Sequence, residues 1–143
     1  MCSWVELLTE SKKISSIFWS DPLLLEDVEL HEINFHRDGP KVTLRMDLKN
    51  YPSNPPKKWR LNNYNTVQVH LEFLDIQSCT LENWTKTSYR LKLDINMESD
   101  LVSLSAASDD FKIKLKSKFL YVSDITAYQN SLSDDQEIKD HKN

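Results

Sequence analysis

Apolar and polar residues alternate along most of the chain between residues 28 and 116. The alternation runs over Val42–Leu48, Val67–Phe73, Tyr89–Met97, Val102–Ala106 and Phe111–Leu115. A period of two predicts strands with one buried and one solvated face. Short links rich in Asn, Asp and Ser separate these stretches, as they do between antiparallel neighbours. We therefore predict a mainly β fold, in which a single antiparallel domain follows a meander and forms a sandwich or a strongly curved sheet.

The first strand is predicted to be irregular. Val28 and Leu30 share one phase of the alternation, whereas Ile33 and Phe35 share the other. One extra residue between the two pairs produces such a change of phase, so this strand is expected to contain a bulge or bend.

Two connections around the second predicted strand are recognisable from their composition. Asp38 and Gly39 predict a hairpin turn, because glycine accepts a positive φ without penalty. The segment Tyr51–Trp59 contains three prolines, which lack the backbone donor that a central strand needs. We predict an extended loop there, anchored by its two aromatic ends.

The N-terminal segment has a helical period. Ser3 and Glu6 have the spacing of a capping box, and Asp21 followed by Pro22 is expected to end the element. The apolar residues recur at roughly helical spacing: Trp4, Leu7, Leu8, Ile14 and Phe18. One N-terminal helix is therefore predicted to pack on the sheet.

Composition fits a single domain with a charged tail. The chain has 143 residues, 39% of them hydrophobic, which suffices for a core without disulfides or a metal. Residues 1–130 are predicted to form the domain, and residues 131–143 a mobile acidic tail. The net charge of −4 argues against nucleic acid or an anionic membrane as a partner.

Targeting and redox features predict a cytoplasmic protein. Neither an export leader nor an apolar stretch of about 18 residues is visible. The cysteines, Cys2 and Cys79, do not suggest a framework of disulfides, and a reducing compartment fits them.

Searches for catalytic and cofactor motifs give no positive result. A single glycine cannot build a phosphate-binding loop, and no nucleophile elbow is present. His31 and His36 resemble a zinc pair but are one residue too far apart, and positions five apart in a strand face oppositely. We predict no cofactor, no metal site and no enzymatic activity.

Charged and aromatic residues have structural explanations that compete with functional ones. Asp47, Glu72 and Asp94 fall on polar strand faces, where cross-strand ion pairs are favoured over an acid–base pair. The lysine row Lys112, Lys114, Lys116 and Lys118 is interpreted as protection of an edge strand. Trp59 and Trp84 could stack on a sugar or base, but anchoring of the core or of loops is favoured.

The order of motifs resembles a known family. The relevant stretches are Leu30–Leu48, Tyr51-Pro52, Pro55–Trp59, Asn65–Phe73, Leu81–Trp84 and Ile125–Tyr128. Together they resemble Immunity protein 50. The resemblance implies a bacterial protein that binds and neutralises a cognate polymorphic toxin, without catalysis. The matched residues Gly39, Pro40, Pro52, Pro56 and Trp59 are interpreted as fold-forming positions.

The toxin contact is predicted to combine carboxylates with a loop aromatic that together occlude the toxin. The chosen residues are Glu72, Asp75, Glu82, Trp84 and Asp94. The alternative is a module that binds a small ligand or carbohydrate in a pocket lined by Tyr and Trp. A hydrolase that uses His31 or His70 with a carboxylate is a third, less favoured reading. The oligomeric state is left open.

Overall fold

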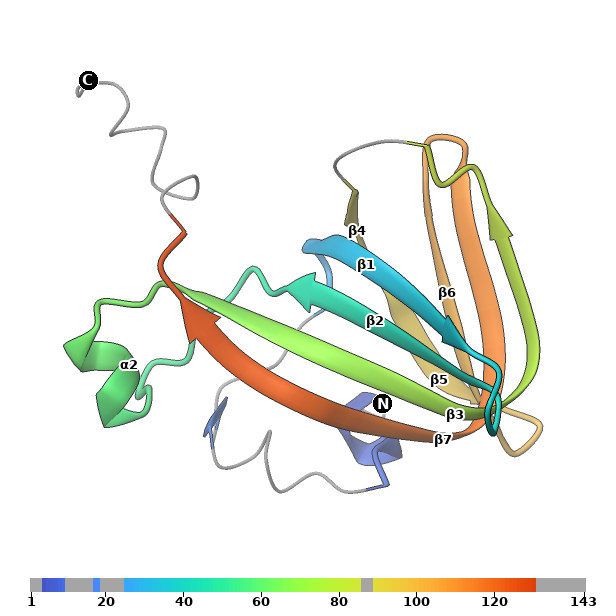
Figure 1. Cartoon of the computed structure of the whole chain (residues 1–143), viewed down its shortest axis with the longest axis horizontal. Helices are drawn as coiled ribbons and strands as arrows, with labels where there is room; N and C mark the ends of the chain where they lie inside the picture. Colours follow the sequence, from blue (N-terminus) through green and yellow to red (C-terminus); the bar gives the residue numbers. More distant parts are fainter. Residues whose placement is uncertain (1–3, 10–16, 19–24, 86–88, 131–143) are drawn as a thin grey trace.

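Seven antiparallel strands form one strongly curved sheet (Figure 1). The structure is a computed structural model that describes residues 4–9, 17–18, 25–85 and 89–130. Its strands are β1 (Val28–His36), β2 (Lys41–Asp47), β3 (Thr66–Glu82), β4 (Arg90–Leu91), β5 (Asp94–Glu98), β6 (Leu101–Ser108) and β7 (Phe111–Tyr128). The order across the sheet is β4-β1-β2-β3-β7-β6-β5. The predicted mainly β fold is confirmed, in its curved-sheet form.

The long strands β3 and β7 run through the whole sheet and divide it into two wings (Figure 1). The first wing contains β1, β2, the start of β3 and the end of β7. The second wing contains the end of β3, the start of β7, β6 and β5, since β2 pairs with β3 only up to Leu74 and β6 with β7 only up to Ser117. Register shifts at His70/Leu71 and Ile76/Ser78 let β3 bend between the wings.

The strand predicted over Tyr89–Met97 is wrong as a single element. β4 pairs with β1 at one end of the sheet, whereas β5 pairs with β6 at the other. Only Lys92 and Leu93 cross between them, so the two ends of the curved sheet come close together. Leu91 and Leu93 are both buried, so the alternation of apolar and polar residues continues across the crossing. The sequence pattern therefore does not reveal where β4 ends and β5 begins.

The first hairpin agrees with the sequence. The register of β1 against β2 shifts between Leu30 and Glu32, which confirms the predicted irregularity. β1 and β2 are joined by a turn in which Gly39 has φ of +60°. The carbonyl of Pro40 accepts a hydrogen bond from the Ile76 N–H (3.1 Å), which ties this turn to the middle of β3.

The proline-containing segment is not extended throughout. A short helix, α2 (Lys57–Leu61), starts after Pro56, while Pro52 is buried. Trp59 is buried on α2, and its ring centroid lies 6.2 Å from that of Tyr51. The predicted aromatic anchoring is confirmed, but the extended conformation is wrong for the residues of α2.

The core lies on the inward face of the sheet. Nine side chains in it have no solvent exposure: Val28, Leu44, Met46, Val67, Leu71, Phe73, Leu104, Ile113 and Leu120. Residues of the N-terminal segment join the same cluster: Trp4, Leu8, Phe18 and Leu25. Burial of this apolar area is the main stabilising term of the fold.

The N-terminal segment covers a stretch of β7 that β6 leaves free. Its first element is a 3-10 helix, η1 (Trp4–Leu7), and the Thr9 N–H donates to the Leu120 carbonyl (2.9 Å). Residues 17–18 are helical. Ser3, residues 10–16 and the predicted helix end at Asp21 lie outside the described residues, as does the predicted tail 131–143.

Candidate functional site

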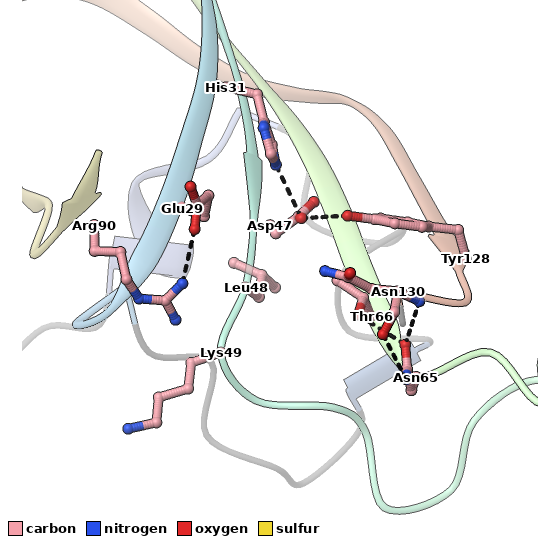
Figure 2. A pocket seen from close by; sticks show the side chains of 10 residues that line it. All are labelled: Glu29, His31, Asp47, Leu48, Lys49, Asn65, Thr66, Arg90, Tyr128 and Asn130. Carbon is pink, nitrogen blue, oxygen red and sulfur yellow. Dashed lines mark hydrogen bonds and ion pairs between the residues drawn. The ribbon is translucent and has the colours of Figure 1, made fainter. Parts of the chain in front are cut away.

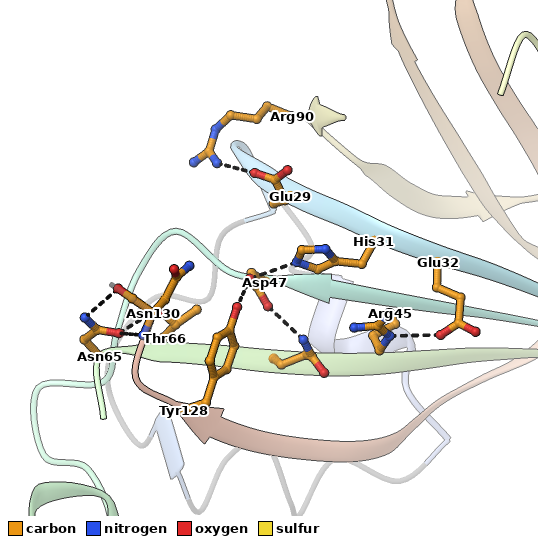
Figure 3. A network of polar contacts seen from close by, with 11 residues as sticks. Glu29, His31, Glu32, Arg45, Asp47, Asn65, Thr66, Arg90, Tyr128 and Asn130 are labelled. Carbon is orange, nitrogen blue, oxygen red and sulfur yellow. Dashed lines mark hydrogen bonds and ion pairs between the residues drawn. The ribbon is translucent and has the colours of Figure 1, made fainter. Parts of the chain in front are cut away.

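A buried carboxylate on the outer face of the first wing forms the centre of the candidate site. Asp47 ends β2 and is 6% exposed, although its phase in the strand directs it away from the core. Its Oδ1 accepts a hydrogen bond from Gln68 Nε2 (3.1 Å), and its Oδ2 lies 2.9 Å from His31 Nε2. The Tyr128 hydroxyl also donates to Oδ2 (Figure 3). Asp47 thereby joins β1, β2, β3 and β7.

The surroundings of Tyr128 change the pKa of its hydroxyl group. Burial raises the pKa of Tyr128 above its usual range, and the hydrogen bond and negative charge of Asp47 add to the effect. The positive charge of Arg45 acts in the opposite direction. Tyr128 is therefore held as a neutral donor to Asp47.

A polar groove of about 510 Å³ opens beside this network (Figure 2). An ion-pair chain forms one side: Arg90 contacts Glu29 (2.8 Å) and Asp27 (3.2 Å), and Lys49 lies 3.6 Å from Asp27. We call this feature, with Asp47 at its base, the Asp47 groove.

The opposite side of the Asp47 groove is fixed by amides. The Asn130 N–H donates to Asn65 Oδ1 (2.8 Å), while Asn65 Nδ2 donates to the Asn130 carbonyl (3.2 Å). In a third hydrogen bond, the Thr66 hydroxyl also donates to Asn65 Oδ1 (2.9 Å). These contacts join the start of β3 to the end of β7 and hold the groove in one shape.

The chemistry of the Asp47 groove suits binding. The described residues of its lining include neither Ser nor Cys, and both oxygens of Asp47 are already hydrogen-bonded. It presents cations, carboxylates and amides within a small area, so it can hydrogen-bond polar side chains of several kinds. Among the described residues, Tyr128 is the one Phe, Tyr or Trp side chain in its lining, so no described Trp offers a stacking platform there.

The structure does not bring the five predicted toxin-binding residues together. Glu72 lies on β3 in the first wing and pairs with Lys41 (3.3 Å), while Asp75, with φ of 61°, pairs with Lys118 (3.7 Å). Both carboxylates already have a cationic partner.

The other three predicted residues belong to the second wing. Glu82 ends β3 and is exposed, and Trp84 follows it, 39% exposed and stacked on Tyr89 with centroids 4.4 Å apart. Asp94 starts the edge strand β5 and lies 3.8 Å from Lys92. These residues and the Asp47 groove are at different ends of β3.

The interpretation of the lysine row as edge protection is wrong. β7 is a central strand, because it pairs with β3 along its length and with β6 from Phe111 to Ser117. The row alternates with buried residues of β7, which explains why it has the pattern of a half-exposed strand.

The three histidines in the described part of the chain do not converge. His31 lies in the Asp47 groove, His36 ends β1, and Nδ1 of His70 is buried without a hydrogen-bond partner in the described part of the chain. Within the residues described, no group of three His, Cys, Asp or Glu side chains could hold a metal ion. None of the described helices is long and apolar enough to cross a membrane.

Sequence reasoning missed most of the Asp47 groove. Gln68, Asn65 and Asn130 occupy ordinary polar positions, and Arg90 is one of the polar residues in the alternation Tyr89–Met97. The one available signal was the motif Ile125–Tyr128, which ends on the tyrosine that contacts Asp47.

Comparison with known proteins identifies a family for this chain. The family model described as Immunity protein 50 matches residues 10–128, a range that includes all seven strands and the residues that contact Asp47. No curated protein and no solved structure matches the chain.

Proposed function

Because this chain belongs to the Immunity protein 50 family, we propose that it protects the bacterium that makes it by binding and neutralising a cognate protein toxin. The family match carries this proposal, since it covers all the described strands. Neutralisation by non-covalent occlusion needs no catalytic group on the immunity protein. The proposal locates the encounter in the cytoplasm, which the free thiol of Cys79 fits.

The Asp47 groove is our candidate for the centre of the toxin contact. Tyr and Arg are enriched among the residues that dominate binding energy, and Tyr128 and Arg90 are both held there by hydrogen bonds. Residues fixed before binding lose little entropy when the partner arrives. A stable complex buries roughly 1,200–2,000 Å² in total, so the surrounding outer face of the first wing would take part.

The predicted carboxylates fit this proposal to different degrees. Glu72 lies on the outer face of the first wing, within reach of a partner that covers the Asp47 groove. Glu82, Trp84 and Asp94 belong to the second wing and would need a separate contact. Their assignment to the toxin interface remains our prediction.

Co-expression with the product of the neighbouring toxin gene tests the proposed function. We expect growth to be rescued and the two proteins to purify as a complex. Failure of both would refute neutralisation by this chain.

Charge reversal at the rim tests the Asp47 groove itself. Lys49→Glu is expected to weaken toxin affinity by about tenfold, or about 1.4 kcal/mol, because Lys49 is an exposed cation on the groove rim. Lys57→Glu makes the same change on α2, outside the groove, and should leave affinity unchanged. Equal affinities of the two variants would exclude the groove as the contact.

One observation also supports a small-ligand module. The groove volume of about 510 Å³ lies in the range of ligand pockets. NMR titration with neutral mono- and disaccharides would test this alternative through the side-chain signals of Gln68 and Asn65. We expect no saturable shift, since no Trp is among the described residues that line the groove; a saturable shift would favour the ligand function.

A further inference from the structure

The end of β3 forms an unpaired sheet edge. β2 stops opposite Leu74, while β3 continues to Glu82 and pairs there only with β7. In Figure 1, this part of β3 is the outermost strand of the second wing. We call residues 78–82 the β3 edge. Among the described residues, no second strand pairs with it.

The β3 edge lacks the usual protection against pairing. Natural edges are blunted by charges, by proline or by bulges. Here the register shift lies before Ser78, and the run from Ser78 to Leu81 contains neither a charge nor a proline. Ser78, Cys79 and Thr80 are exposed. A regular and accessible edge that is uncharged from Ser78 to Leu81 suits the addition of a strand.

Lysines line the outer face beside this edge. Ser78 and Thr80 pair with Lys116 and Lys114 of β7, which pair in turn with Ser103 and Ser105 of β6. Directly paired residues share one face of a sheet, so the lysines stand between rows of short hydroxyl side chains. These residues line a hollow of about 530 Å³.

The lysines of β7 differ in whether their charge is already neutralised. Lys116 contacts Glu98 (3.1 Å) and Lys118 contacts Asp75 (3.7 Å). No described carboxylate lies in ion-pair contact with Lys112 or Lys114, although Glu82 is opposite Lys112 in the register. The β3 edge is therefore next to positive charge that is available to a partner.

We propose that the β3 edge binds an extended, acidic segment of a partner protein, which adds a strand to the second wing. Neighbouring strands in a sheet are about 4.8 Å apart. The added strand would pair with β3, so β3 would separate it from β7, the strand that contains Lys112 and Lys114. A Glu side chain of the added strand would reach Lys114 over the short Thr80, while Lys112 stands one position further along β7, opposite Glu82. The partner is the cognate toxin, so this inference rests on the proposed function and adds a second contact to it.

A peptide titration tests the edge without the toxin. The probes are two eight-residue peptides, one of alternating Glu and Thr and the other of alternating Lys and Thr. We expect the acidic peptide to bind about tenfold more tightly, because only its charges complement Lys112 and Lys114. Amide exchange of residues 78–82 should slow in its presence. Equal binding, no binding or protection elsewhere would overturn the proposal.

Matched charge variants identify the lysines. The double variant Lys112→Glu/Lys114→Glu should abolish the preference for the acidic peptide. Lys57→Glu/Lys58→Glu carries the same charge change on α2, away from the β3 edge, and should keep the preference. Circular dichroism checks that both variants fold, and an unchanged preference in a folded Lys112/Lys114 variant would contradict the proposal.

Two further measurements separate this inference from its alternatives. In a complex with the toxin, slowed exchange at residues 78–82 would support the edge contact, whereas unchanged exchange there would overturn it and leave the proposed function intact. If the chain alone sediments as a dimer with these amides protected, the edge belongs to a second copy and the proposal is wrong.

Discussion

At the scale of single residues, Asp47 shows what the alternation of apolar and polar residues predicts about a side chain and what it does not. The pattern of β2 correctly directs its side chain outward. Burial arises because His31, Gln68 and Tyr128 come from three other strands, one of them 81 residues away in the sequence. A local pattern reports which face a residue occupies, but it contains no information on what neighbouring strands place over it.

The buried position of Asp47 predicts a large difference between two similar substitutions. Asp47→Asn should cost about 2–3 kcal/mol, because a charged acceptor is lost and the new amide group meets existing donors. Glu72→Gln removes a half-buried ion pair at the surface and should cost about 0–1 kcal/mol. Urea unfolding of both variants measures the difference, and equal losses would contradict the role given to Asp47.

Tyr128 gives a prediction at high pH. Its pKa is raised in the folded protein, so its contribution to stability is complete below the pKa of an unfolded tyrosine, about 10. Above that pH the unfolded tyrosine ionises first, and the contribution is lost as pH rises toward the folded pKa. Unfolding free energies measured between pH 8 and 11.5 should therefore fall more steeply in the native chain than in Tyr128→Phe. Parallel curves would refute the raised pKa of Tyr128 in the folded protein.

At the scale of elements, the strand pattern located β2 and β6 well but underestimated β3 and β7. The alternation of buried residues holds in β3 only to Phe73 and in β7 only to Ser117, so each pattern breaks where the strand passes from one wing to the other. The crossing at Lys92 and Leu93 was hidden for the opposite reason, since its buried leucines keep the phase. α2 was missed because the prolines before it dominated the composition.

A substitution at the crossing between β4 and β5 is predicted to destabilise the fold strongly. Leu93 is 5% exposed, and its N–H donates to the Leu25 carbonyl (2.8 Å). Leu93→Ala should cost about 2–5 kcal/mol. Leu61→Ala, at a 72% exposed position, should stay within about 0.5 kcal/mol. Thermal or urea unfolding decides, and a small loss at Leu93 would show that the crossing tolerates a cavity.

At the scale of the whole molecule, the two wings are expected to unfold together. β3 and β7 belong to both wings, and one continuous core cluster includes residues from each. A small domain with shared strands and one core should behave as a two-state system.

Tryptophan fluorescence can compare the two wings directly. Trp59 lies on α2 beside the first wing, and Trp84 follows the end of β3 in the second. In variants that keep only one of the two, with the other tryptophans replaced by Phe, the urea midpoints should agree after correction for each variant's stability. Separate transitions in one variant would show that the wings unfold independently.

The pairing of β3 with β7 also sets the order of events during synthesis. Its first pair, Thr66 with Tyr128, is 62 residues apart, and its last pair, Glu82 with Lys112, is 30 apart. Contacts between such distant residues slow folding. A growing chain therefore holds β3 without its main partner until β7 has left the ribosome. The Asp47 groove, which needs Tyr128, is completed only at that late stage, so a nascent chain has no assembled groove with which to meet its partner.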